Sequence, residues 1–172
     1  MMHTKRLVLS ALLAASIFIS IIFLHVPNGF GGVIHFGDAL IFISAALLPF
    51  PYALFVAAIG AGMFNLVMVP IWLPFTIVIK PLMTLCFTVK GDTILGSLRN
   101  IVGPFLGLTI NTVLYFFANW ILFTEYTAIA AAPALLIQGF GSVIFYFIIA
   151  YVLDRISIKK LLAKGGLYDN RL

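Results

Sequence analysis

The segment PNGFGGVIHFGD, residues 27–38, separates two apolar stretches of the chain and decides how the rest is organised. It holds four glycines together with the polar side chains of Asn28, His35 and Asp38. Glycine lets the backbone turn sharply and approach a ligand closely. We therefore interpret this segment as a loop that lines a binding site, although an ordinary connection between two membrane helices would have a similar composition.

The composition places the chain in a membrane. Of its 172 residues, 63% are hydrophobic and 9% are charged, and the mean hydropathy is +1.21. Charged residues make up roughly a quarter of an ordinary soluble domain. A spanning helix needs about 20 residues, so the chain has room for about six spans in one domain, residues 1–172. The first apolar run is longer than the core of a signal peptide and lacks a small-residue cleavage site, so we expect it to be the first membrane helix.

The basic residues predict the topology. Nine of the ten Lys and Arg side chains fall into three clusters. The clusters are Lys5 and Arg6, then Lys90 and Arg99, and finally Arg155, Lys159, Lys160, Lys164 and Arg171. Cytoplasmic loops of membrane proteins are enriched in Lys and Arg, so all three clusters are expected on the cytoplasmic side. Breaks in the apolar sequence leave four segments between the first two clusters and two segments between the last two. We therefore predict an all-α integral membrane protein with six transmembrane helices and cytoplasmic N- and C-termini.

The second predicted helix is unusually short. The six helices are expected at residues 5–24, 38–48, 52–68, 74–89, 101–123 and 128–156. The second is too short to cross a hydrocarbon core of about 30 Å. Irregular backbone at membrane depth is tolerated only where protein or a water-filled cavity covers it. This is a second reason to expect a cavity at residues 27–38, on the outer face.

Charged and polar side chains inside membrane segments are candidate functional residues because their burial is costly. Lys80 lies near the middle of the fourth predicted helix, with Thr76 one turn earlier on the same face. It could anchor a ligand, or it could form an ion pair with Asp38 or Glu125. Asp38 could contact a ligand or cap the second helix. His35 could bind a ligand or only satisfy the loop backbone.

Two stripes of polar residues follow the fifth and sixth predicted helices at four-residue spacing. They consist of Asn111, Tyr115 and Asn119 on the fifth helix and of Gln138, Ser142 and Tyr146 on the sixth. Both stripes should face the bundle interior, because buried polar groups in lipid need partners. There they either line a cavity or bond to each other. Trp72 could stack on a planar ligand or lie at the membrane interface. The candidate substrate-binding residues are Asn28, His35, Asp38, Trp72, Thr76, Lys80, Asn111, Tyr115, Asn119, Glu125, Gln138 and Tyr146.

Several motifs are absent from the sequence. It contains no GxxxxGK[ST], HExxH or GxSxG segment, and its single cysteine, Cys86, offers no metal-ligand pair. We expect no catalytic residue, metal or cofactor, and no nucleic-acid partner. Any active transport must draw its energy from other subunits.

Three segments resemble the substrate-capture (S) component of an energy-coupling factor (ECF) transporter: Ala11 and Ala15 in the first helix, IHFGDA at residues 34–39, and LLP at residues 47–49. The resemblance covers nearly the whole chain. It implies that the protein binds a vitamin or related micronutrient from outside. It also implies that Ala11 and Ala15 contact a transmembrane coupling subunit that carries two cytoplasmic ATPases. Asn65 departs from the family, whose members often have an acid at this place.

Within that family the chain most resembles the branch for queuosine precursors, which are 7-deazaguanine bases such as queuine. Asp38 or Glu125 could accept two hydrogen bonds from the guanine-like edge of such a base, and Trp72 or Tyr115 could stack on it. Thiazole, hydroxymethylpyrimidine and pantothenate stay open as other ligands. An autonomous proton-coupled carrier, and an intramembrane enzyme that uses His35, Asp38 and Lys80, stay open as other classes of protein.

Overall fold

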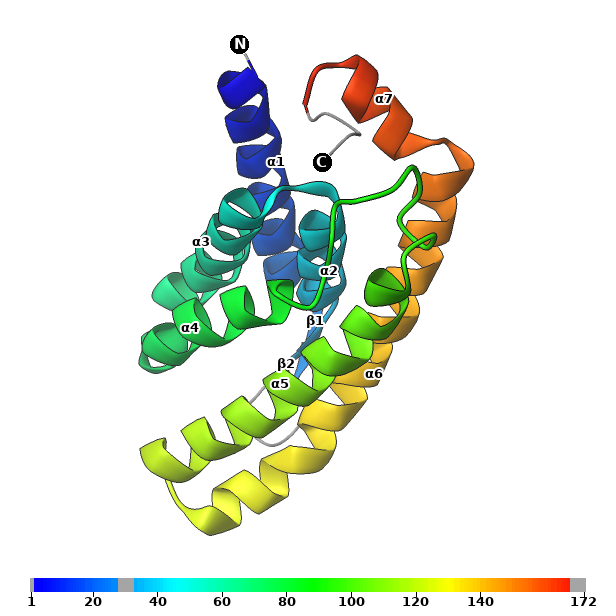
Figure 1. Ribbon diagram of the computed structural model, residues 1–172. Helices are drawn as coiled ribbons and strands as arrows, with labels where there is room; N and C mark the ends of the chain where they lie inside the picture. Colours follow the sequence, from blue (N-terminus) through cyan, green and yellow to red (C-terminus); the bar gives the residue numbers. More distant parts are fainter. Residues whose placement is uncertain (1, 28–32, 168–172) are drawn as a thin grey trace.

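The computed structural model describes residues 2–27 and 33–167 and is mostly helical (Figure 1). In chain order the elements are α1 (Met2–Phe23), β1 (His25–Pro27), β2 (Val33–His35), α2 (Gly37–Leu47), α3 (Phe50–Met68), the 3-10 helix η1 (Pro70–Trp72), α4 (Leu73–Thr84), α5 (Leu98–Leu122), α6 (Glu125–Arg155) and α7 (Ile158–Lys164). Among the described residues, four helices are long and apolar enough to cross a membrane, namely α1, α3, α5 and α6. The helix α2 and the η1–α4 segment are apolar but shorter.

Each of the six predicted segments forms a helix, and the largest difference lies at the end of the fourth. This helix was expected to continue to residue 89, but α4 ends at Thr84. After Thr84 the backbone N–H groups of Leu85, Cys86 and Phe87 bond three residues back instead of four. Thr88 then takes its backbone partners from the side-chain amide of Asn100. Its Oδ1 accepts from Thr88 N at 2.8 Å, and its Nδ2 donates to Thr88 O at 2.9 Å and to Ile94 O at 3.0 Å. The hairpin β1–β2 and the helix α7 were not predicted.

The short helix α2 lies at the centre of the molecule, in contact with α1, α3, α4, α5 and α6 (Figure 1). Ten of its eleven residues are buried. A helix that is apolar on all sides is expected in a core rather than at a surface. Asp38, in its first turn, is therefore buried as well, with 1% of its surface exposed. The central helix thus brings an acid into the interior of the bundle.

A two-stranded antiparallel hairpin precedes α2. His25 in β1 pairs with His35 in β2, and Val26 pairs with Ile34. This hairpin leads directly into α2 and packs beside α6. The predicted loop of residues 27–38 is therefore partly a β-strand and the start of a helix, and Asn28 lies outside the described residues.

Close helix packing depends on Gly60. A Cβ atom at Gly60 would lie 2.9 Å from the backbone oxygen of Ala14 and 2.9 Å from the Cβ of Ile17. Small residues let membrane helices approach closely. The absence of a side chain at this position therefore sets the distance between α1 and α3.

Polar contacts join three segments at one end of the bundle. The carboxylate of Asp154 accepts from Ile94 N at 2.6 Å and from Leu95 N at 2.9 Å. Lys159 in α7 donates to the backbone oxygen of Val89 at 3.1 Å, and Lys5 in α1 donates to that of Gly165 at 2.8 Å. We call this the basic end, because it carries Lys5, Arg6, Lys90, Arg99, Arg155 and Lys159. In Figure 1 it is the end with the N-terminus and α7.

Candidate functional site

A cavity of about 370 Å³ lies inside the bundle. It is enclosed by α1, β2, α3, η1, α4, α5 and α6. Its lining residues are Ile21, His35, Ala61, Phe64, Asn65, Val69, Trp72, Thr76, Lys80, Asn111, Tyr115, Asn119, Phe123, Thr127, Ala131, Leu135 and Gln138. Trp72, Asn119, Phe123 and Thr127 belong to helix ends that are remote from the basic end (Figure 1). The cavity therefore lies toward the opposite end of the molecule.

An ion pair forms the floor of this cavity. Lys80 Nζ donates to Asp38 Oδ1 at 2.6 Å and to Asn111 Oδ1 at 2.8 Å. Gln138 Nε2 donates to the second carboxylate oxygen of Asp38 at 3.1 Å. The four side chains come from α2, α4, α5 and α6, and all are buried. Because the lysine and the carboxylate offset each other, the floor is polar but carries no net charge.

His35 lies at the edge of this network. Its Nδ1 accepts from the backbone N–H of Gly37 at 3.2 Å, and its Nε2 lies 3.3 Å from Gln138 Nε2. Burial is the main cause that lowers the pKa of His35, from 6.5 to about 4; the Asp38 charge opposes this change and the Lys80 charge adds to it. The imidazole is therefore neutral at physiological pH and offers hydrogen bonds rather than a charge.

A chain of hydroxyl and amide groups forms one wall. Thr76 Oγ1 lies 2.6 Å from Tyr115 Oη and also accepts from Asn65 Nδ2. Lys80 Nζ lies 5.2 Å from the centre of the Tyr115 ring, which is within range of a cation–π contact. The wall joins α3, α4 and α5, so that its polar groups hold one another in place.

Aromatic rings form another part of the lining, next to Tyr115. The ring centre of Trp72 lies 5.8 Å from that of Tyr115 and 6.0 Å from that of Phe123. Phe64 adds a fourth ring. Such faces bind flat, unsaturated rings well.

One polar atom of the lining lacks a partner. Among the described residues, the buried Nδ2 of Asn111 has no hydrogen bond, while Oδ1 of the same side chain accepts from Lys80. A buried donor without a partner is destabilising, and native structures usually satisfy it. Asn111 therefore presents a donor that an acceptor on a bound molecule would satisfy.

Eight of the predicted substrate-binding residues lie together in this lining: His35, Trp72, Thr76, Lys80, Asn111, Tyr115, Asn119 and Gln138. Asp38 lies just beneath them and contacts Lys80 and Gln138. Asn28 is outside the described residues, and the other two predicted residues lie away from the cavity. Glu125 is the exposed first residue of α6, and Tyr146 is buried beyond the cavity, where its hydroxyl donates to Asn100 O at 3.0 Å.

Sequence reasoning missed part of the lining. Asn65 was noted only as a departure from relatives, although one amide in an otherwise apolar helix is itself a signal of an interior position. Phe64, Phe123, Ala131 and Leu135 also line the cavity. Apolar residues carry no comparable signal, because those that face a cavity and those that face lipid look alike in a membrane sequence.

Comparison with known proteins gives one result. A family model described as "ECF-type riboflavin transporter, S component" matches residues 1–162. No curated protein and no solved structure matches the chain. The matched family corrects the predicted branch, because it is the riboflavin transporter family rather than the group for queuosine precursors.

Proposed function

The chain belongs to the family of ECF-type riboflavin transporter S components, and from this premise we propose that it captures riboflavin or a closely related flavin in the cavity described above. As a member of this family it is a substrate-binding subunit of a vitamin transporter, lies in the plasma membrane and is not an enzyme. The family also implies that it works with the proteins of an ECF module. The choice of ligand depends on the lining of the cavity.

The aromatic lining supports a flat ring system as the ligand. Trp72, Tyr115, Phe123 and Phe64 offer faces or edges on which an isoalloxazine ring would stack. The volume of about 370 Å³ lies in the range of about 300–1,000 Å³ that is usual for small-molecule sites. The single observation that carries the proposal is this combination of aromatic walls with an uncharged polar floor.

The polar lining supports a neutral ligand with several hydrogen-bonding edges. The amides of Asn65, Asn111, Asn119 and Gln138 line the cavity. An amide group can both donate and accept, which matches the alternating carbonyl and N–H groups of the flavin's pyrimidine-dione edge. A flavin carbonyl would also satisfy the Nδ2 atom of Asn111.

A deazaguanine base is supported less well. Its amidine edge offers two N–H donors, for which a carboxylate is the best acceptor. Of the two acids considered for this role, Asp38 is already engaged by Lys80 and Gln138, and Glu125 is exposed at the start of α6. A queuosine precursor is therefore the second candidate ligand, and its binding would require Asp38 to leave Lys80.

The topology completes the proposal. Basic residues stay on the cytoplasmic side of a membrane, so the basic end faces the cytoplasm and the cavity faces the outside. We propose six membrane segments with both termini inside, namely the four long helices together with the shorter α2 and η1–α4 segments. Ala11 and Ala15 are exposed on α1, where small side chains would let a coupling subunit pack closely.

The decisive experiment is a binding titration on detergent-purified protein with riboflavin and queuine. Riboflavin should bind tightly and its own fluorescence should be quenched by the aromatic lining. Asn111→Leu removes the Nδ2 donor in the cavity, together with the Oδ1 that accepts from Lys80. It should weaken riboflavin at least about tenfold, as expected when a buried polar contact is lost. Thr112→Val is the matched control on the neighbouring residue of α5, which does not line the cavity.

Each outcome has a clear meaning. Riboflavin binding that falls in Asn111→Leu but not in Thr112→Val supports both the ligand and the site. Queuine binding in place of riboflavin would overturn the proposed ligand but leave the vitamin-capture role intact. Equal riboflavin binding by wild type and Asn111→Leu would mean that riboflavin binds outside this cavity.

A further inference from the structure

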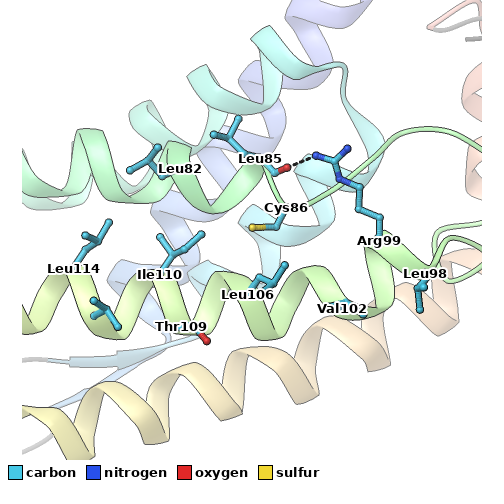
Figure 2. A pocket seen from close by; sticks show the side chains of 11 residues that line it. Leu82, Leu85, Cys86, Leu98, Arg99, Val102, Leu106, Thr109, Ile110 and Leu114 are labelled. Carbon is cyan, nitrogen blue, oxygen red and sulfur yellow. Dashed lines mark hydrogen bonds between the residues drawn. The ribbon is translucent and has the colours of Figure 1, made fainter.

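A second hollow lies outside the cavity, on the surface between α4 and α5 (Figure 2). It is a groove of about 890 Å³. Leu82 and Leu85 lie on its α4 side, and Val102, Leu106 and Ile110 lie on its α5 side (Figure 2). Its lining is almost wholly apolar and plays no part in the proposed vitamin site.

The unequal lengths of two helices create this groove. The helix α4 has 12 residues and α5 has 25, which correspond to about 18 Å and about 38 Å at 1.5 Å per residue. The helix α5 therefore extends past the end of α4 toward the basic end. Leu98, Val102 and Leu106, in the first part of α5, remain exposed as a result.

The basic end of the groove carries a positive charge. Arg99 lines the groove there, and its Nη2 donates to the backbone oxygen of Leu85 (Figure 2). The Arg99 side chain is exposed. A guanidinium has five N–H donors, so one bond to a carbonyl leaves others for an anion. Among the residues that line the groove, Arg99 is the only one with a charge.

We propose that this groove binds one acyl chain of an anionic phospholipid and that Arg99 binds the phosphate of the same lipid. The apolar walls match a hydrocarbon chain, and Arg99 lies where a headgroup would meet the membrane surface. Basic side chains close to the membrane surface attract anionic lipids. A guanidinium binds phosphate oxygens through parallel N–H donors.

The size of the groove favours a lipid over a membrane helix of a partner. From Leu98 to Leu114 the groove follows α5 for about 24 Å. A helix about 10 Å across would occupy roughly 1,900 Å³ over that length, about twice the groove volume, so about half of it would stand outside the groove. An acyl chain is thinner and fits between the side chains of α4 and α5.

Photo-crosslinking tests the proposal with the full chain reconstituted in vesicles. The probe is phosphatidylglycerol with a diazirine on its acyl chain, and phosphatidylcholine with the same group is compared. Mapped adducts at residues 82–86 and 98–114 should be about fivefold more abundant with phosphatidylglycerol, as one basic contact implies. Arg99→Gln should reduce that yield to the phosphatidylcholine level, and Leu106→Trp should lower both yields by filling the groove.

Two controls distinguish specific lipid binding from a general effect of positive charge. Lys164→Gln removes an exposed positive charge at the same end, on α7, and should leave the preference intact. Inorganic phosphate at millimolar concentration should not compete, since the acyl chain supplies part of the binding. Equal adduct yields with the two lipids in wild type would show that the groove contacts membrane lipid without preference, and this would overturn the proposal.

Cys86 provides a test that needs no substitution. It is the single cysteine of the chain and lines the groove. Phosphatidylglycerol should slow its reaction with a membrane-permeant maleimide at least twofold more than phosphatidylcholine does. No difference between the lipids would overturn the proposal even if Arg99→Gln failed to fold. A protein captured at Cys86 in cell membranes, with no lipid adduct, would assign the groove to a partner and also overturn it.

Discussion

Lys80 Nζ lies 2.6 Å from Asp38 Oδ1, and this ion pair ties α4 to the central helix α2 beneath the cavity. The two side chains are 4% and 1% exposed. Taking two charges out of water is costly, so a buried pair persists only where further hydrogen bonds satisfy both groups. Asn111 and Gln138 supply those bonds. The pair therefore forms a polar floor beneath the cavity that carries no net charge.

We expect the loss of one member of this pair to be more damaging than the loss of both. Asp38→Asn leaves the Lys80 charge buried and should destabilise the protein by about 3–5 kcal/mol. Asp38→Asn combined with Lys80→Met should recover much of that stability. Unfolding of the purified protein in detergent, followed by circular dichroism, measures both effects. Asp92→Asn is the control, because Asp92 is exposed and lies 4.0 Å from Lys160. Lys80→Met alone completes the double-mutant cycle. If the double variant is as unstable as the sum of the two single variants, the two charges do not interact.

Trp72 should contribute to ligand affinity through ring stacking. Trp72→Ala should weaken riboflavin about three- to tenfold, the range expected for one aromatic contact, while Trp72→Phe should keep most of the affinity. Trp120→Ala is the matched control, since Trp120 is 48% exposed and does not line the cavity. Quenching of flavin fluorescence on titration gives the dissociation constants. If all three variants bind alike, the ring of Trp72 does not stack on the ligand.

The interior walls of the site could be predicted from sequence because polar side chains at four-residue spacing are conspicuous in an apolar helix. Asn111, Tyr115 and Asn119 line the cavity, which is one of the two arrangements that this spacing left open. Tyr146 continues the Gln138 stripe, but it lies eight residues further on, about 12 Å along the helix, and so falls past the cavity. Spacing predicts which face of a helix a residue lies on, but not whether that residue lies level with the cavity.

Neither the ion-pair partner of Lys80 nor the identity of the ligand could be predicted from patterns in the sequence. Two acids, Asp38 and Glu125, were equally plausible partners for Lys80, and only the burial of α2 separates them. The queuosine-precursor branch was suggested by resemblance, whereas the matched family is that of riboflavin transporters. Amides and aromatic rings suit many flat heterocycles, so their presence in a sequence does not select one of them.

The burial of His35 predicts a loss of stability in mild acid. Its pKa is lowered from 6.5 to about 4, mainly by burial. The unfolded chain takes up a proton near pH 6.5, but the folded chain resists it until about pH 4. The stability associated with neutral His35 is thus fully present above pH 6.5 and is lost as the pH falls toward 4.

Thermal unfolding in detergent between pH 7.5 and about 4.5 tests this dependence. The unfolding midpoint of wild type should fall steadily below about pH 6.5, and His35→Gln should flatten that decrease. His3→Gln, at an exposed position of α1, is the matched control. An identical decrease in wild type and His35→Gln would show that other groups cause the acid sensitivity.

Two glycine variants should have opposite effects. Gly60→Ala places a Cβ atom 2.9 Å from the backbone of Ala14, so α1 and α3 must move apart, and we expect destabilisation by about 1–3 kcal/mol. Gly141→Ala meets nothing within 4 Å and should be neutral or stabilise α6 by up to about 1 kcal/mol, because alanine favours helix. The midpoints of unfolding in detergent compare the two. A stable Gly60→Ala variant would mean that the contact between α1 and α3 is not tight.

The exposed face of α1 should be needed for transport but not for capture of the vitamin. Ala11 and Ala15 are exposed and lie apart from the residues that line the cavity. Ala11→Trp and Ala15→Trp should therefore leave the riboflavin dissociation constant unchanged. Uptake by cells that also produce the coupling subunit and its ATPases should fall at least about tenfold, since a bulky ring prevents close helix packing. Ile144→Trp on the lipid-facing side of α6, where Ile144 is 59% exposed, is the matched control and should keep uptake. Normal uptake by both alanine variants would place the coupling subunit on another face, whereas a parallel loss of binding would indicate a general effect on the fold.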